Sequence, residues 1–151
     1  MNTPLLVKNS ITINAPAAKV WDALVNPAQT KKYMFGCETV SDWKIGSPLL
    51  WKGTFNGVEL VAVKGDIVAL VPEKHLAYTT IDPNNADIAD VPENYLTVTY
   101  DLEEQGGQTQ LTVSQGDYSK VAEGQRRYEE TAGSDGWQPI LVEIKKLVEA
   151  E

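Results

Sequence analysis

The chain has 151 residues, of which 42% are hydrophobic and 23% are charged, so its composition is that of an ordinary folded domain. There are 13 Lys and Arg residues against 21 Asp and Glu residues, which gives a net charge of −8. The basic residues gather only in pairs, at Lys31-Lys32, Arg126-Arg127 and Lys145-Lys146. Nucleic acid and anionic membranes both require a concentrated basic face. We therefore expect neither as a partner.

The length and the lack of a linker or repeat predict one domain, residues 1–151. The first residues lack the basic start and the apolar stretch of a secretory signal. No apolar run approaches the ~18 residues of a membrane span. The single cysteine, Cys37, cannot form an internal disulfide. These features predict a cytoplasmic location.

The spacing of apolar residues changes near residue 14, from the alternation of a strand to the spacing of a helix. Residues 5–13 alternate apolar and polar side chains, which predicts a strand. From Asn14 or Ala15 the apolar residues recur at helical spacing, with a proline in the first turn, and Pro27 ends this helix. Residues 28–35 have room for one or two further turns before Gly36.

Residues 47–116 are typical of antiparallel strands. Two strands, residues 47–55 and 58–71, flank Asn56-Gly57, a strong hairpin signal. Gly65 interrupts the second strand, as a bulge or bend would. Further strands are predicted at residues 74–81, 95–104 and 109–115; a polar loop precedes the last two, and "QGGQ" joins them.

The last part of the chain is helical. Residues 119–133 have helical propensity that Gly124 and Gly133 interrupt, and Asp135 then offers a helix cap. An apolar stripe at i, i+3, i+4 and i+7 spacing follows, formed by Trp137, Ile140, Leu141, Ile144, Leu147 and Val148. We expect this helix to cover the apolar face of the sheet, with Ile140, Leu141 and Ile144 buried. The fold class is therefore α+β.

Four blocks of the sequence, in order, resemble one family: "ITINAPAAKVWDALVNP", "KKYMFG…VSDWKIGSPLLWKG", "KGDIVALVPEKHLAYTT" and "GWQPILVEIKKLVEA". The chain resembles a stand-alone member of the START-like (SRPBCC) superfamily. More narrowly, it is similar to homologues of the C-terminal domain of activators of the heat-shock-protein-90 ATPase. The resemblance covers about residues 10–150.

The resemblance implies a helix-grip (START/Bet v 1-like) fold. A curved antiparallel sheet of about six to seven strands would wrap around a long C-terminal helix, with one or two short helices after the first strand. A hydrophobic cavity would lie between sheet and helix. Members of the superfamily bind lipids, hormones or polyketides, and a few are enzymes. Eukaryotic activators carry a further, chaperone-binding domain for which this chain has no room.

Aromatic side chains from several segments are the candidate wall of this cavity. An apolar pocket with a few polar tips suits a small hydrophobic molecule. The alternative is that the same side chains interdigitate and leave no void. We assign Trp43 and Phe55 to the rim or to plain packing. The predicted cavity-lining residues are Tyr33, Phe35, Leu49, Trp51, Tyr78, Tyr100, Trp137 and Leu141.

Catalytic motifs are sparse. Cys37 and His75 are the only residues of their types, which argues against a metal site and against a cysteine nucleophile with its base. A general acid or base would require that Glu38, Glu59 or Asp66 point inward, where burial would raise its pKa. The acidic loop from Asp82 to Glu93 lacks the ligand spacing of a calcium loop. We expect no metal and no cofactor, and we assign no catalytic residue.

Three functions follow from these observations. The favoured one is a non-enzymatic domain that binds a small apolar or aromatic ligand. The alternative is a chaperone-cofactor role related to heat-shock-protein-90 ATPase activation, with Trp43, Tyr128 and Arg126-Arg127 as candidate anchors. The second alternative is a small cyclase- or hydrolase-like enzyme that uses a cavity carboxylate.

Overall fold

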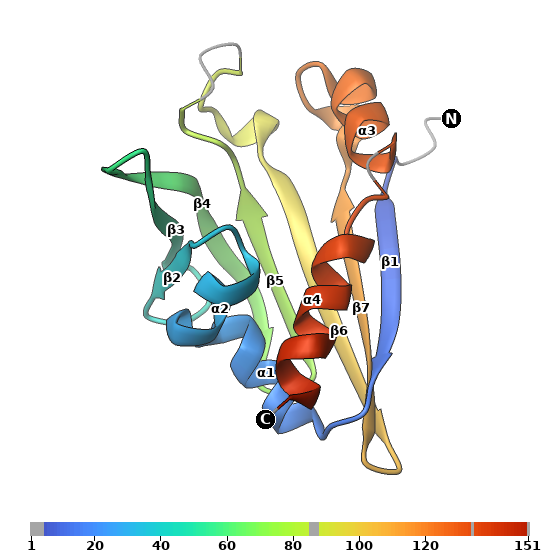
Figure 1. Cartoon of the computed structure of the whole chain (residues 1–151). Coiled ribbons are helices and arrows are strands. Elements are labelled where there is room, and N and C mark those ends of the chain that lie inside the picture. The colour runs from blue at the N-terminus through green and yellow to red at the C-terminus, as the bar shows by residue number, and fades with distance from the viewer. Residues whose placement is uncertain (1–4, 85–87, 134, 151) are drawn as a thin grey trace.

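The computed structural model describes residues 5–84, 88–133 and 135–150 (Figure 1). A curved, seven-stranded antiparallel sheet has the strand order β1-β7-β6-β5-β4-β3-β2. This is the α+β, helix-grip architecture that the sequence predicts. The strands are β1 (Val7–Ile13), β2 (Glu38–Ser41), β3 (Pro48–Phe55), β4 (Val58–Val71), β5 (His75–Thr80), β6 (Leu96–Gln105) and β7 (Gln108–Gly116). The α-helices are α1 (Ala17–Val25), α2 (Pro27–Tyr33), α3 (Gly124–Gly133) and α4 (Gln138–Glu149), and two short 3₁₀ turns are η1 (Pro92–Asn94) and η2 (Tyr118–Lys120).

Both predicted hairpins form with left-handed turn residues. Asn56 and Gly57 have φ angles of 52° and 81° between β3 and β4, and Gly106 and Gly107 have φ angles of 63° and 82° between β6 and β7. Two consecutive positive φ angles match the twist of the flanking strands in a two-residue hairpin. The turn chemistry of the sequence therefore sets the register of both hairpins.

Strand β4 runs through Gly65 without a break, so the predicted interruption is a close approach within a continuous strand. A Cβ atom at Gly65 would lie only 1.6 Å from the carbonyl oxygen of Thr79. The β3–β4 register shifts at Trp51/Lys52, and the β4–β5 register shifts at Ile67/Ala69. Each shift places an extra residue in one strand, which bends that strand.

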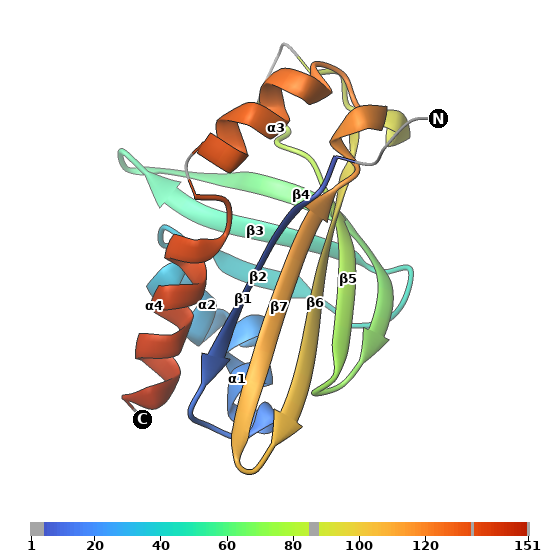
Figure 2. The ribbon, with the colours of Figure 1, turned by 90° about the vertical axis from the view of Figure 1, so that its right-hand side faces the viewer.

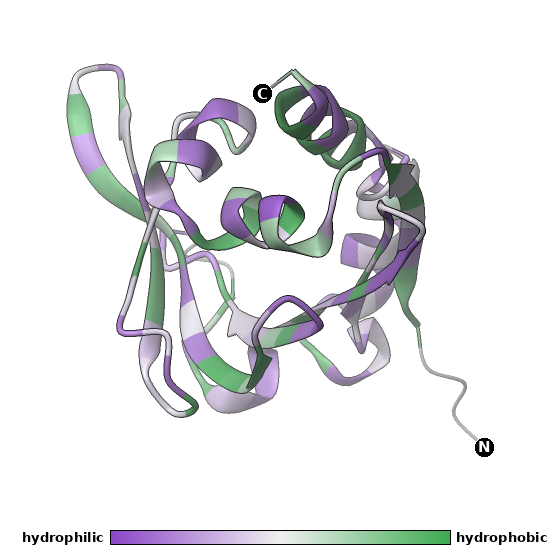
Figure 3. Ribbon diagram, turned by 90° about the horizontal axis from the view of Figure 1, so that it is seen from below, coloured by the Kyte–Doolittle hydropathy of each residue, from purple (hydrophilic) through white to green (hydrophobic). Residues whose placement is uncertain are grey.

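Helix α4 lies against β1 and also contacts α1 and α2 (Figures 1 and 2). Seen along the fold in Figure 3, the sheet curves around the helices. Leu141 and Ile144 are fully buried in this contact, as predicted. Ile140 was expected to be equally buried, but it is only half-buried, because it lies where α4 leaves the packed core.

Two predicted helix starts differ from those observed. Helix α1 begins at Ala17 with Pro16 at its N-cap, and the Ala17 N–H donates to Glu104 Oε1 (2.6 Å) instead of to a local cap. Asp135 does not cap α4, because it has a φ of 67° and the helix starts three residues later. In both places a contact or a backbone conformation set by the tertiary structure decides the boundary.

Within the ranges that the structure describes, no helix has the length and apolarity required to cross a membrane.

Candidate functional site: an apolar pocket beside the terminal helix

A pocket of about 410 Å³ lies between the curved sheet and the N-terminal end of α4. This volume falls in the range of small-molecule sites. Its wall draws on the loop after α2, on strands β3 to β7 and on helices α3 and α4. The lining residues are Met34, Phe35, Cys37, Trp51, Phe55, Ala62, Val63, Tyr78, Thr80, Val98, Gln115, Thr131, Gly136, Trp137 and Ile140.

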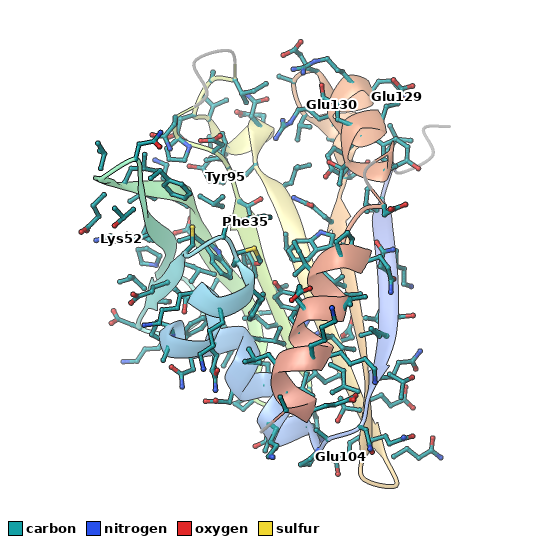
Figure 4. All side chains as sticks on the ribbon, in the orientation of Figure 1. Phe35, Lys52, Tyr95, Glu104, Glu129 and Glu130 are labelled. Carbon is teal, nitrogen blue, oxygen red and sulfur yellow. The ribbon has the colours of Figure 1, made fainter. Side chains whose placement is uncertain are left out.

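The corner between α1, α2 and β2 holds one side of the pocket in place. The Tyr33 hydroxyl donates to the Ala23 carbonyl (2.6 Å), and the Thr30 hydroxyl donates to the Cys37 carbonyl (3.1 Å). The Thr39 hydroxyl donates to the Val25 carbonyl (2.9 Å). These hydrogen bonds fix the loop that carries Phe35. This residue has a φ of 54°, lines the pocket and is 77% exposed (Figure 4).

Four aromatic rings form a continuous row from the sheet to α4. The centroids of Trp51 and Tyr78 are 6.3 Å apart, those of Tyr78 and Tyr100 are 5.9 Å apart, and those of Tyr100 and Trp137 are 5.9 Å apart at an edge-to-face angle of 89°. Tilted and edge-to-face rings at these separations attract one another. Trp51, Tyr78 and Trp137 of this row line the pocket, and Tyr100 packs against them from the core.

Trp137 is held at both of its N–H groups. Its backbone N–H donates to Asn9 Oδ1 (3.0 Å), and its indole Nε1–H donates to Gln115 Oε1 (3.0 Å). The preceding Gly136 has a φ of 58°, and a Cβ atom there would lie 2.6 Å from Asn9 Oδ1. A glycine is thus required to bring the indole against the pocket.

The structure divides the eight predicted cavity residues into two sets. Phe35, Trp51, Tyr78 and Trp137 line the pocket. The other four are buried in the core behind its wall and do not line it: Tyr33, Leu49, Tyr100 and Leu141. Tyr33 turns its hydroxyl away to Ala23, and Leu141 faces the packed side of α4, which explains their absence from the wall. That any of the eight contacts a ligand stays a prediction.

The hydroxyl and thiol groups around the pocket are neutral near physiological pH. Burial is the main cause that raises the pKa of Tyr33, Tyr78 and Tyr100 above the usual tyrosine value. Burial also raises the pKa of the Cys37 thiol, which opposes its use as a thiolate nucleophile. None of the described residues that line the pocket is charged.

Several lining residues escaped the sequence analysis. Ala62, Val63 and Val98 look like ordinary strand residues, and Phe55 had been assigned to the rim or to packing. Gln115 could have been predicted to face the pocket, because it follows Leu111 and Val113 on the inward-facing side of β7 and is polar. A polar residue at an apolar position of an alternating strand marks a place where packing is interrupted.

The three candidate catalytic carboxylates point away from the pocket. Glu38, Glu59 and Asp66 are all exposed, and none lines it, so the premise of the cyclase- or hydrolase-like alternative is wrong. His75 lies at the start of β5, and its Nδ1 is 2.6 Å from Asp101 Oδ1, on the outside of the sheet. Within the described ranges, no cluster of three or more His, Cys, Asp or Glu side chains could hold a metal. The acidic loop falls partly outside the described residues.

The comparisons with known proteins identify the family. The family model described as "Activator of Hsp90 ATPase homolog 1-like protein" matches residues 14–149. The solution structure of ChR145 from Cytophaga hutchinsonii is 35% identical, covers 99% of this chain and 97% of its own, and has a TM-score of 0.73.

More distant structures share the fold. Ms6760 from Mycobacterium smegmatis is 17% identical, with 98% of this chain and 93% of its own covered and a TM-score of 0.75. The Aha1 dimer from Colwellia psychrerythraea is 18% identical, with 95% and 96% covered and a TM-score of 0.67. Among curated proteins, no sequence matches. The chain belongs to the Activator of Hsp90 ATPase homolog 1-like protein family.

Proposed function

We propose that this protein is a non-enzymatic binding domain that takes a small apolar or aromatic molecule into the pocket beside α4. The observation that carries the proposal is the pocket itself, with about 410 Å³ of space among aromatic and aliphatic side chains. A packed core would fill such a space. The aromatic row gives flat faces against which a ring can stack, and the exposed Phe35 borders the entrance.

Binding is tested with tetralin, an uncharged bicyclic hydrocarbon, titrated into the protein while amide chemical shifts are recorded. We expect the shifted amides to concentrate around β3, β4, β5 and the start of α4. Shifts confined to the outer face of the sheet, or no saturable shifts, would contradict the proposal.

A substitution that fills the pocket tests whether tetralin binds there, and the same substitution on the surface is its control. Ala62 lines the pocket from β4 and is half-buried, so Ala62→Phe places a ring in the empty space. We expect tetralin affinity to fall at least about tenfold in this variant, since the ligand and the new ring compete for one volume. Ala18→Phe adds the same ring on the exposed face of α1 and should leave the affinity unchanged.

A chaperone-cofactor role is the second candidate, because the matched family is described by activation of the Hsp90 ATPase. The anchors suggested for it are exposed or half-buried, and most of them already have partners within the chain. Arg126 is paired with Glu123 and Glu130, Tyr128 packs edge-on against Tyr118, and Trp43 is half-buried. A test is the ATPase rate of the purified host chaperone with this protein at low ionic strength. No change at tens of micromolar would rule out activation. A cytoplasmic location stays a prediction in either case.

A further inference from the structure

Several side chains that can donate a hydrogen bond line the pocket, among them Gln115 and Thr131. Gln115 is the clearest case. The indole N–H of Trp137 can only donate, so the Gln115 amide must turn its oxygen toward it. This fixes the amide orientation and leaves the Gln115 NH₂ group to face elsewhere. It donates to no other residue in the described part of the chain, and Gln115 lines the pocket.

The tyrosine pair adds no accessible donor. The hydroxyls of Tyr78 and Tyr100 lie 3.1 Å apart, and either could donate. The two residues are 2% and 1% exposed, and neither hydroxyl has another described hydrogen-bond partner. Either choice of donor leaves the second proton within this buried pair, so Gln115 is the more accessible donor at the pocket.

Thr131 supplies another donor at the α3 end. Its hydroxyl oxygen accepts from the Tyr118 hydroxyl (3.3 Å), which leaves its own proton to be donated, and Thr131 lines the pocket. Thr131 and Gln115 also border a smaller cleft, which is lined as well by Asp82, Arg126, Arg127 and Glu130. No charged residue among those described lines the pocket itself, so an ion held inside it would lose its hydration without an opposite charge at the wall.

We infer that the pocket selects an uncharged, largely apolar molecule that carries a carbonyl or similar acceptor, and that the Gln115 amide NH₂ group is the residue group that recognises this acceptor. The inference rests on the proposed binding function and narrows its ligand class. Gln115 is thus a specificity-determining residue, while Trp51, Tyr78 and Trp137 supply apolar contact.

The experiment compares 1-tetralone with tetralin, two molecules of nearly equal shape that differ by one carbonyl, and measures both dissociation constants by amide-shift titration. We expect tetralone to bind about 3- to 10-fold more tightly, as one neutral hydrogen bond allows. In Gln115→Met the dissociation constants for tetralone and tetralin should become about equal, while the tetralin affinity stays within about twofold of wild type. Tetralin-2-carboxylate should bind more weakly than either neutral probe.

Two further variants separate recognition from folding. Gln110→Met makes the same substitution on the outward face of β7, where Gln110 is exposed, and should keep the full preference for tetralone. Gln115→Glu can still accept from the Trp137 indole but as a carboxylate has no N–H. In this variant the indole N–H resonance of Trp137 should therefore stay near its wild-type position, while the preference for tetralone disappears.

The outcomes distinguish the two proposals. If tetralin binds in the pocket but tetralone gains nothing, or if Gln115→Met keeps the gain, the inference about Gln115 is overturned and the binding function stands. If neither probe binds in the pocket, both are overturned.

Discussion

The two ends of helix α4 meet different surroundings. Toward its C-terminus, Ile144 and Val148 are at most 2% exposed and pack into the core with β1 and α1. At its N-terminal end, Trp137 and Ile140 border the open space of the pocket. One amphipathic stripe thus supplies both the main packing contact of the fold and a wall of the candidate site. Apolar periodicity alone does not reveal where packing ends.

The largest expected difference between the two ends is in stability. Ile144→Ala should lower the free energy of unfolding by ~2–5 kcal/mol and the melting temperature by about 5–15 °C, because it leaves a cavity in a filled region. Ile140→Ala should cost only ~1 kcal/mol, since Ile140 already borders empty space. Thermal unfolding followed by circular dichroism measures both. Equal costs would mean that the two ends are packed alike.

A smaller effect should appear within the tyrosine pair, which lies in the filled region. Tyr78→Phe and Tyr100→Phe each leave the other hydroxyl buried without its hydrogen-bond partner and should each cost ~1–3 kcal/mol. Denaturant unfolding of the two variants measures both losses. A loss near zero in either variant would contradict the assignment of both hydroxyls to the packed region.

The smallest effect concerns a carboxylate at the packed end. Glu149 accepts from the backbone N–H of Asn14 (2.9 Å) and pairs with Lys145, and the first of these contacts is the main cause that lowers its pKa. A pKa lowered on folding adds stability that is fully present above the ordinary glutamate pKa of about 4.3 and is lost as the pH falls through the native pKa.

Glu149→Gln should therefore lower the melting temperature slightly at pH 7, and the difference from wild type should vanish toward pH 3. Melting curves across this range test it. Glu59→Gln provides the control, because Glu59 is exposed near the β3–β4 turn and accepts no backbone N–H from a described residue. If the melting temperature of Glu149→Gln stayed equally far below that of wild type at pH 3, the assigned stabilising role of the Glu149 carboxylate would be contradicted.

Much of the fold could be predicted because its signals are local. The stripe of α4 and the Asn56-Gly57 and Gly106-Gly107 turns lie within a few neighbouring residues, and all three form as expected. Strand β2 was not singled out, because its four residues carry no strong pattern. Its position depends instead on contacts such as Thr39 with Val25.

The site was less accessible from sequence. Aromatic residues are large and rare, so the sequence indicates them as candidates, and the structure joins Trp51, Tyr78, Tyr100 and Trp137 into one row. Which of them face empty space depends on how the curved sheet meets α4, and no local pattern encodes that geometry. Gln115 became visible as a donor only once the Trp137 indole was known to occupy its oxygen.

The most direct test of the account is where a bound hydrocarbon touches the protein. Intermolecular nuclear Overhauser effects between tetralin and the methyl-labelled protein report this contact. We predict effects from Val63, Val98 and Ile140, which line the pocket, and none from Leu111 or Leu141 in the packed core. Effects from the exposed Val58, Val68 or Val71 alone, or none at all, would contradict the claim that the N-terminal end of α4 borders a ligand-binding pocket.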